Sequence, residues 1–485
     1  MSIKTILSQK RNNGIDFTDT TTWLISVLCI STMISFIISL LALFENNGCE
    51  LLFLLPVSFG FLLIISRCKF LDFPMNIGAV LIAGIEFVKL VLVPMLYVLS
   101  GFPKTIGYNA LTNDYYGILL QAYEALWIGY AISRGSRYKE EKLNVESIEN
   151  KKSNKKLRYL LAAVLLGTFF ICAIAPEILL NYRSILSVTD SQYTNIEQSY
   201  IVNQYATSTF KKFFLVLANY WLKPVRLIFP AVIMVVLKKT NKKWTKPLAL
   251  LVAVSPMMII DGTVARSLYF TLVLLLLYYY LYKVETKMLV AVVVAAGVFI
   301  IVYWCIRFFA VDRNNTLFVY FAEKFNDYFC GFNIVGATLN LPDGIDFRIK
   351  YFLYDFIRTI PFANTLFGLD AADTVRNFFN AFSKTTGGQI ASTLGMSSYY
   401  LTPLLAPLYS YIFARNAINY SGLANDIKNP YYKMVYYFIA LYFTLGIGLN
   451  DISTTLSNLV QVAFPIYLIV RIAYPKKAIK KEIGQ

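Results

Sequence analysis

Two cations lie three residues apart in an otherwise apolar stretch of the chain. The stretch reads WLKPVRLIFP (221–230), and Lys223 and Arg226 lie on either side of Pro224. Side chains three residues apart project from one face of a helix. A cation in hydrocarbon is unfavourable by about 2.5–3.5 kcal/mol on insertion scales, so we expect an anion against this face, either a protein carboxylate or a ligand. Pro224 removes a backbone hydrogen bond and permits a kink here.

Three further ionisable residues lie within apolar stretches. Glu86 and Lys89 are three residues apart, which predicts an ion pair within one helix. Glu124 has no cation within a helical turn, and we expect it to neutralise Lys223 or Arg226. It is also a candidate catalytic carboxylate, because a carboxylate can accept a proton.

A short turn between two apolar runs carries an acid and a base. It reads MMIIDGTVARSLYF (257–270) and contains Asp261, Gly262 and Arg266. Because the turn is short, Arg266 is expected at the depth of lipid headgroups, where it can bind a lipid-linked diphosphate. Asp261 is a candidate proton acceptor, and an Asp261–Arg266 ion pair remains the structural alternative.

The chain contains no histidine. This excludes Ser-His-Asp and Cys-His mechanisms and removes the commonest zinc ligand. The six cysteines are scattered, without the spacing of a metal site. We therefore predict neither a metal nor a cofactor.

The elements that carry these residues are predicted to be membrane-spanning helices. Hydrophobic residues make up 57% of the 485 residues and charged residues only 15%, and apolar runs long enough to cross a bilayer recur along the chain. The sequence thus predicts an all-α polytopic membrane protein with about twelve transmembrane helices. The predicted spans are 23–44, 51–66, 74–98, 115–133, 158–180, 213–237, 247–260, 268–282, 288–305, 400–414, 434–449 and 456–472.

Basic residues orient this arrangement. With both termini in the cytoplasm, most of the 45 Lys and Arg residues fall in cytoplasmic segments, as the positive-inside rule requires. The net charge of +17 therefore needs no nucleic-acid partner. We expect one transmembrane domain over residues 1–485, with an external loop at 181–212 and a large, partly helical one at 306–399, between spans nine and ten.

Lysine predominates in the cytoplasmic segments, whereas arginine is as frequent as lysine outside. The planar guanidinium group suits phosphate and carboxylate oxygens. As a group, the external arginines therefore indicate an anionic ligand at the outer face. They are Arg183, Arg266, Arg307, Arg313, Arg348, Arg358 and Arg376.

The large external loop contains a predicted amphipathic helix. Residues 346–362, DFRIKYFLYDFIRTIPF, place Arg348, Asp355 and Arg358 on or near one face and aromatic residues on the other. Such a helix lies at the membrane surface. Tyr399 and Tyr400 follow at the end of this loop and are candidates for stacking on sugar rings.

The layout and three stretches resemble the bacterial O-antigen and capsule repeat-unit polymerases of the Wzy type. The stretches are DGTVARS (261–267), YFLYDFIRTIPF (351–362) and GGQIASTLGMSSYYLTPLLAPLYS (387–410). The resemblance covers nearly the whole chain by layout.

This resemblance implies a metal-independent glycosyltransferase similar to the GT-C superfamily, in the inner membrane with its site facing outward. It implies transfer of a growing chain from undecaprenyl diphosphate to the non-reducing end of the next lipid-linked unit, in capsule or lipopolysaccharide synthesis. An accompanying chain-length regulator is implied as a partner, beside membrane lipid. Arg226 and Arg266 are then expected on the diphosphate, with Arg348 and Arg358 on the loop above it. The remaining residues expected to bind substrate are Lys223, Arg313, Arg376, Tyr399 and Tyr400.

Two other functions remain open. A flippase or another transporter for lipid-linked oligosaccharides also has about twelve spans and internal cations, but such proteins usually show two similar halves and short external loops. Another GT-C-like transferase is the second alternative. An O-antigen ligase is disfavoured, because that family uses a histidine.

Overall fold

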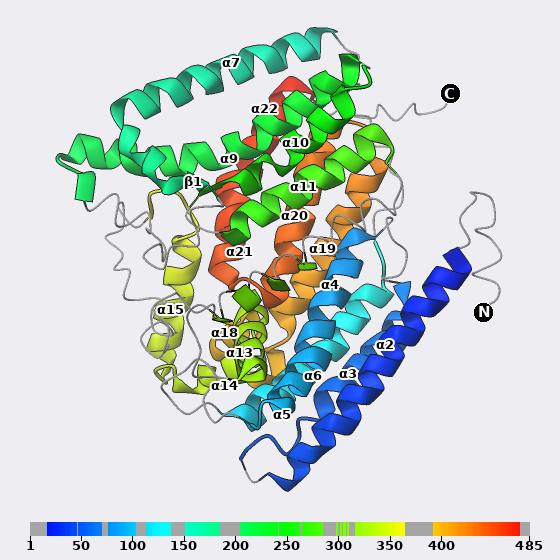
Figure 1. Ribbon diagram of the computed structural model, residues 1–485. Coiled ribbons are helices and arrows are strands. Elements are labelled where there is room, and N and C mark those ends of the chain that lie inside the picture. The colour runs from blue at the N-terminus through cyan, green and yellow to red at the C-terminus, as the bar shows by residue number, and fades with distance from the viewer. Residues whose placement is uncertain are drawn as a thin grey trace, which may run out of the picture.

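The structure is a computed structural model and is almost entirely helical (Figure 1). By length and composition, five of the described helices are apolar enough to cross a membrane: Trp23–Phe44, Ile77–Leu99, Lys152–Ile174, Thr209–Thr240 and Ile452–Ala473. An all-α membrane protein is therefore confirmed. The described residues are 17–45, 47–69, 76–102, 113–136, 151–184, 204–240, 242–261, 264–284, 297–298, 301–302, 304–306, 308–309, 316–363 and 391–475.

The helices follow one another with few strands between them. Up to the first strand they are α2 (Phe17–Ser39), η1 (Leu40–Phe44), α3 (Leu54–Ser66), α4 (Ile77–Phe87), η3 (Val88–Leu92), α5 (Val93–Leu99), α6 (Asp114–Ser133), α7 (Lys151–Ile174) and η4 (Pro176–Asn181). Strand β1 (Tyr182–Ser184) precedes α9 (Thr209–Thr240) and α10 (Thr245–Met258), and β2 (Ile259–Asp261) precedes α11 (Val264–Tyr282). The rest are α13 (Leu317–Phe329), α14 (Phe332–Gly336), η6 (Ala337–Asn340), α15 (Ile345–Ile357), α18 (Thr393–Tyr400), η7 (Pro403–Leu405), α19 (Leu408–Asp426), α20 (Pro430–Gly448), α21 (Ile452–Asn458), η8 (Leu459–Ala463) and α22 (Phe464–Ala473).

Described helices overlap most of the predicted spans. The overlapping spans are 23–44, 51–66, 74–98, 115–133, 158–180, 213–237, 247–260, 268–282, 434–449 and 456–472. The predicted span at 288–305 lies largely outside the described residues. The number of spans and their order across the membrane stay predictions.

The predicted span at 400–414 is wrong. The chain breaks after α18, and α19 begins only at Leu408, after two prolines at 403 and 407, and continues to Asp426. Proline is tolerated in the first turn of a helix but not inside it, which explains the late start. Arg415 lies just beyond the predicted end of the span at residue 414, and the polar residues from there to Asp426 concealed the rest of the helix. Arg415 is buried and donates to the carbonyls of Ala131 and Gly135 at the end of α6, at 3.1 and 2.7 Å.

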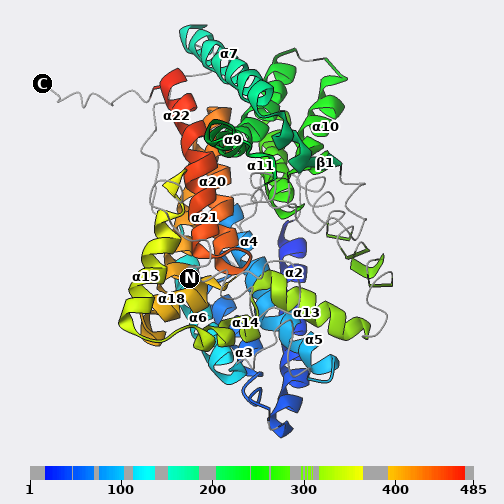
Figure 2. The same ribbon diagram turned by 90° about the vertical axis from the view of Figure 1, so that its left-hand side faces the viewer.

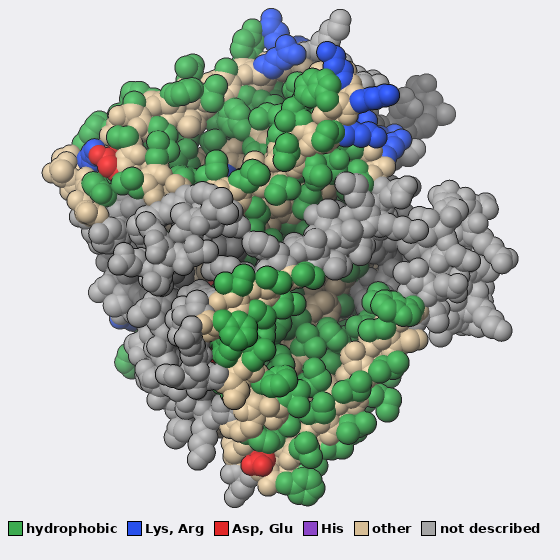
Figure 3. Space-filling view, viewed as in Figure 1, with side chains coloured by type: hydrophobic (Ala, Val, Ile, Leu, Met, Phe, Trp, Pro, Cys, Tyr) green, Lys and Arg blue, Asp and Glu red, His purple; other side chains and the backbone are tan. Residues whose placement is uncertain are grey.

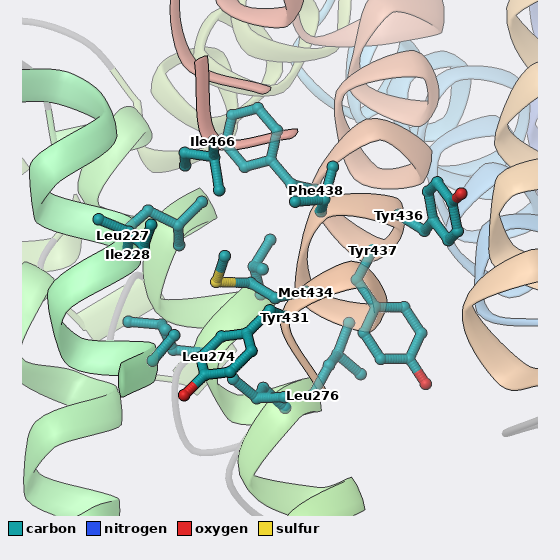
Figure 4. Close-up of a cluster of buried hydrophobic side chains, with 14 of the residues drawn as sticks. Leu227, Ile228, Leu274, Leu276, Tyr431, Met434, Tyr436, Tyr437, Phe438 and Ile466 are labelled. Atoms are coloured by element: carbon teal, nitrogen blue, oxygen red, sulfur yellow. The ribbon is translucent and has the colours of Figure 1, made fainter. Parts of the chain in front are cut away.

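Two large apolar cores, beside two smaller clusters, hold the described helices together. The first is built from α2–α6, α13–α15, α18 and α19, and the second from α7, α9–α11, α20 and α22. Figure 2 shows α7, α9, α10 and α11 at one end of the molecule and α3 and α5 at the other. In the second core, Leu227 and Ile228 of α9 meet Leu274 of α11, Met434 of α20 and Ile466 of α22 (Figure 4). Helix α20 lies between the two groups and contacts α4, α11 and α19.

The surface has a basic end and broad apolar flanks. Figure 3 shows Lys and Arg side chains gathered at one end of the visible face, where α7 begins, α9 ends and α10 begins. Large apolar side chains are exposed along α2 and α7, including Met33, Ile37, Leu166 and Phe169. Exposed apolar flanks are what a bilayer requires of a spanning bundle.

The segment predicted to be the large external loop is partly buried in the protein. Helix α14 packs against the start of α6, and Phe332 and Val335 are inaccessible to solvent. Glycine permits this approach: a Cβ at Gly117 would lie 1.9 Å from the Phe332 carbonyl oxygen, and one at Gly336 would lie 2.2 Å from that of Asn113. Residues 393–399 of α18 are also buried. This segment therefore contributes to the core as well as to the surface.

The amphipathic helix predicted at 346–362 is confirmed as α15, followed by a turn through Pro361. The predicted division of its faces is wrong for Asp355, which is only 2% exposed and accepts a hydrogen bond from the Tyr400 hydroxyl at 2.5 Å. Ile345, Ile349 and Leu353 are four residues apart and exposed, so the outer face is apolar. Such a face is typical of a helix that lies on a membrane surface.

Two of the helices that could span a membrane each contain a π-helical turn. In both, a proline follows two residues after the end of that turn. In the first, η3 runs from Val88 to Leu92 and Pro94 follows, and in the second, η8 runs from Leu459 to Ala463 and Pro465 follows. Proline lacks the N–H that would continue the α-helical pattern. π-Helical turns often mark functional sites, and both of these turns contain a buried polar residue, Lys89 or Gln461.

Candidate functional site

Arg226 reaches from α9 to the turn between α10 and α11. One terminal nitrogen of its guanidinium group donates to the carbonyls of Pro256 at 3.2 Å and Ile259 at 2.5 Å, and to the Ser267 hydroxyl at 3.2 Å. The group also lies 5.6 Å from the ring centre of Phe270. Arg226 therefore ties both ends of residues 256–267, which we call the α10–α11 turn.

Other buried cations bind helix ends in the same way. The last carbonyls of a helix have no partner within it, and hydrocarbon offers them no water. Arg415 binds two carbonyls at the end of α6, and Lys433 binds those of Ala424 and Asn425 at the end of α19. A cation also complements the negative end of the helix dipole. Arg226 accordingly has a positioning role at the end of α10.

A two-stranded sheet fixes the outer side of the α10–α11 turn. Strand β1 pairs antiparallel with β2, with Tyr182 opposite Asp261 and Arg183 opposite Ile260. Asp261 ends β2, but its side chain lies outside the described residues. Arg266 lies in the first turn of α11 and is partly exposed. The structure thus brings the backbone of Asp261, and Arg266 with its neighbour Ser267, close to Arg226.

Lys223 faces another element, one turn earlier on α9. It is 8% exposed, and its ammonium group donates to the side-chain oxygen of Gln461 in η8 at 2.9 Å. It also lies 5.3 Å from the ring centre of Tyr220. The Gln461 amide in turn donates to the carbonyl of Thr359, just after α15, at 3.5 Å. Lys223 is thereby linked to the end of the amphipathic helix.

The turn after α15 packs on α9. Phe362 stacks on Phe213 with ring centres 5.5 Å apart and lies 5.3 Å from the ring of Tyr220. Arg358 caps α15 and lies four residues before Phe362. Lys223 and Arg226 lie on α9, and Arg266 and Arg358 lie on two segments that contact α9. We call these four residues the α9 cation cluster.

Glu124 does not belong to this cluster. Its carboxylate accepts a hydrogen bond from the Lys89 ammonium group at 2.7 Å and another from the Ser410 hydroxyl, and its side chain is fully buried. The expectation that Glu124 neutralises Lys223 or Arg226 is therefore wrong. Its burial and its pairing with Lys89 also make it unsuitable as a catalytic base beside Arg266. The Glu86–Lys89 ion pair is confirmed, at 3.1 Å.

Arg348, Tyr399 and Tyr400 lie at the other end of α15 and on α18. Arg348 forms an ion pair with Asp343 at 2.8 Å, and the backbone N–H of Gly344 and then Arg348 hold the pKa of Asp343 below its usual value. Arg348 also lies 5.7 Å from the ring centre of Tyr399. Ten residues of helix, about 15 Å, separate Arg348 from Arg358, so the structure does not bring Arg348 into the α9 cation cluster.

Both tyrosine hydroxyls at the end of α18 have protein partners. Tyr399 donates to the carbonyl of Pro342 at 2.6 Å, and Tyr400 donates to Asp355. Burial raises the pKa of Tyr399 to about 12, so it remains a hydrogen-bond donor at neutral pH. These contacts fix α18 against α15 and the residues just before it, and the two rings also pack on Tyr351 and Phe352.

Sequence patterns missed two residues of the site and named two that the structure does not describe. Gln461 had a signal, because it is a polar residue within an apolar run, and Ser267 lies inside the DGTVARS stretch. The residues that flank them in the sequence did not indicate that Gln461 binds Lys223 or that Ser267 binds Arg226. Arg313 and Arg376 lie outside the described residues.

Replacing Arg226 with methionine should destabilise the α10–α11 turn. The substitution removes the donor that the carbonyls of Pro256 and Ile259 share; only the Pro256 carbonyl is partly buried, so we expect a loss near the lower end of the range of about 1–3 kcal/mol for a buried unpaired group. Thermal unfolding of the purified protein in detergent measures the loss. Lys239→Met, on the exposed end of the same helix, is the matched control and should change stability little. An Arg226→Met protein as stable as wild type would contradict the positioning role.

The residue types of the site favour anion binding. Within the parts of the chain that the structure describes, no group of three or more Cys, Asp or Glu residues is arranged to hold a metal ion. The α9 cation cluster instead offers guanidinium and ammonium groups beside aromatic rings. No family model, no curated protein and no solved structure matches this chain.

Proposed function

We propose that this protein is a membrane-embedded polymerase of lipid-diphosphate-linked oligosaccharide units, at the outer face of the cytoplasmic membrane of a bacterium. The observation that carries the proposal is that α9, with Lys223 and Arg226, contacts both the α10–α11 turn, which carries Arg266, and the turn after α15, which carries Arg358. These segments lie away from the basic helix ends of α7, α9 and α10 (Figure 1). The positive-inside rule assigns those basic ends to the cytoplasm.

The proposed chemistry matches the charges of the cluster. When a sugar leaves a lipid diphosphate, negative charge develops on the bridging oxygen, and fixed cations stabilise it. Arg266 and Arg358 are proposed to bind the diphosphate directly, because arginine donates two parallel hydrogen bonds to phosphate oxygens. Arg226 holds the turn that carries Arg266, and Lys223 adds positive potential from within α9.

The acceptor side of the reaction needs a base and sugar contacts. Asp261 is the proposed proton acceptor for the attacking hydroxyl, because it ends β2 in the turn that also carries Arg266. Arg348 and Tyr399 lie too far along α15 to share the diphosphate, and we assign them to the sugars. Neither a metal nor a cofactor is required by this scheme, and an accompanying chain-length regulator is its proposed partner.

A transporter of lipid-linked oligosaccharides is the second candidate. The observation that favours it is the pair of π-helical turns, each beside a proline within a spanning helix. Interrupted helices with buried polar groups are common at the binding sites of transporters. Another transferase acting on a lipid-linked sugar would use the same cations, and its product would contain one added sugar rather than a polymer.

A gel profile of surface polysaccharide tests the proposal. A strain that lacks the gene should show single repeat units, and the restored gene should return a ladder of polymer. Repeat units that accumulate inside the cell would identify a flippase instead. Long polymer that stays on its lipid carrier would identify a ligase and contradict the proposal.

A further inference from the structure

Three ionisable side chains form a buried cluster apart from the α9 cation cluster. Glu86 of α4, Lys89 of η3 and Glu124 of α6 are each at most 1% exposed. The Lys89 ammonium group lies 3.1 Å from Glu86 and 2.7 Å from Glu124, and the Ser410 hydroxyl of α19 donates to Glu124. Helices α4, α6 and α19 meet here (Figure 1).

The charges of this cluster do not balance. Two ionised carboxylates and one ammonium group leave one negative charge in excess within an apolar bundle, which is strongly unfavourable. The other described charged groups on the helices packed against the cluster, and beside them, are Glu45, Glu50, Arg67, Lys69, Asp114, Arg134, Glu323, Lys324, Asp327, Arg415, Asp426, Lys428, Lys433 and Asp451. Among these neighbouring groups, two cations are buried, Arg415 and Lys433. Both bind carbonyls at the ends of helices and so do not neutralise the cluster.

The cluster also lacks hydrogen-bond donors. One carboxylate oxygen of Glu86 (Oε2) is buried and has no hydrogen-bond partner among the described residues. The side-chain oxygen of Gln121, three residues before Glu124 on the same face of α6, is in the same state, while its amide donates to the Cys330 carbonyl at 2.7 Å. Both atoms are acceptors. A hydrogen on one carboxyl group would supply the missing donor as well as remove the excess charge.

The backbone around Lys89 is unusual. Lys89 lies in the π-helical turn η3, before Pro94. Its side chain passes the bare backbone of α20: a Cβ at Gly448 would lie 3.3 Å from Lys89 Cδ and 2.6 Å from Ile85 Cγ2. The lysine is therefore packed between the two carboxyl groups and against the end of α20.

We propose that Glu86, Lys89 and Glu124 form a proton-binding site. One carboxylate is paired with Lys89, and the other carboxyl group carries a proton. The site joins α4, α6 and α19 and lies within the membrane-spanning bundle. It does not depend on the proposed polymerase activity.

Infrared spectroscopy of the purified protein in lipid tests this site, because a protonated carboxyl group has a carbonyl band distinct from that of a carboxylate. At neutral pH the wild-type protein should show this band. Glu86→Gln and Glu124→Gln should each lose it, since one remaining carboxylate matches Lys89. Glu177→Gln, which changes a partly exposed carboxylate bound to Lys211 at 2.6 Å, should retain it.

Thermal unfolding of the same variants provides a second measurement. Each single Gln variant should unfold close to wild type, whereas Glu86→Gln with Glu124→Gln isolates Lys89 and should lower the unfolding temperature by more than the two single effects together. A wild-type protein without the band overturns the proposal, as does a band that persists in both single variants. A band that appears only when sodium and potassium are removed would show a metal-cation site and would also overturn it.

Discussion

Replacing Arg266 with alanine should reduce chain elongation about 100- to 1,000-fold, the usual effect of removing one group that stabilises developing charge. The residue lies in the first turn of α11, beside Ser267, which binds Arg226. Its loss should leave the fold intact, because Arg226 still ties the α10–α11 turn. Arg266→Lys keeps the charge but loses the paired hydrogen bonds and should give an intermediate rate.

The measurement is polymer length and yield at equal amounts of protein in the membrane. Lys324→Ala removes one positive charge from α13, where Lys324 lies 5.4 Å from the Tyr320 ring centre, and serves as the matched control. It should leave the ladder unchanged. A wild-type ladder from Arg266→Ala at wild-type protein level would remove Arg266 from the proposed site.

Replacing Lys89 with methionine should give the largest loss of stability of any single change considered for this chain. The substitution leaves Glu86 and Glu124 buried without their shared cation. Breaking a buried ion pair by removing one partner costs about 3–5 kcal/mol. The loss should become smaller as the pH falls, because acid neutralises the remaining carboxylate.

Unfolding in mixed detergent micelles at several pH values measures this effect. Adding Glu86→Gln and Glu124→Gln to Lys89→Met removes both unpaired acids and should recover part of the stability. Lys324→Met, a cation on α13 outside the cluster, should change little. A Lys89→Met protein as stable as wild type at neutral pH would show that the cluster does not support the fold.

The sequence predicted the helical class and most helix positions because hydrophobicity alone decides which segments enter a bilayer. Because the prediction used hydrophobicity alone, it misplaced α19. Arg415 and Asp426 make this helix polar by composition, yet Arg415 is buried because it binds carbonyls at the end of α6. Hydropathy cannot reveal a polar side chain that is satisfied by another helix.

Ion pairs within a turn were predictable, but those between helices were not. The spacing of Glu86 and Lys89 was enough to predict their contact. The second carboxylate, Glu124, lies 35 residues further along the chain, and only the packing of α6 brings it to Lys89. The same holds for Arg226, whose three acceptors lie 30 to 41 residues away. Partner choice depends on tertiary packing, which residue types and spacing leave undetermined.

The sequence pattern also did not predict which side of α15 faces the protein. Asp355 was expected with the exposed arginines, but it accepts a hydrogen bond from Tyr400 and faces inward. A single buried carboxylate with a good donor satisfies the rule that buried polar groups are paired. The helix itself was predictable from its periodicity and from Pro361.

The most direct test of the proposed polymerase activity uses the purified protein in lipid nanodiscs with a polyprenyl-diphosphate-linked oligosaccharide as the only substrate. We predict longer lipid-linked chains and the release of one polyprenyl diphosphate for each unit joined, with little product from Arg266→Ala. If lipid-linked units cross the bilayer of reconstituted vesicles and no new glycosidic bond forms, the protein is a transporter and the proposed chemistry is wrong.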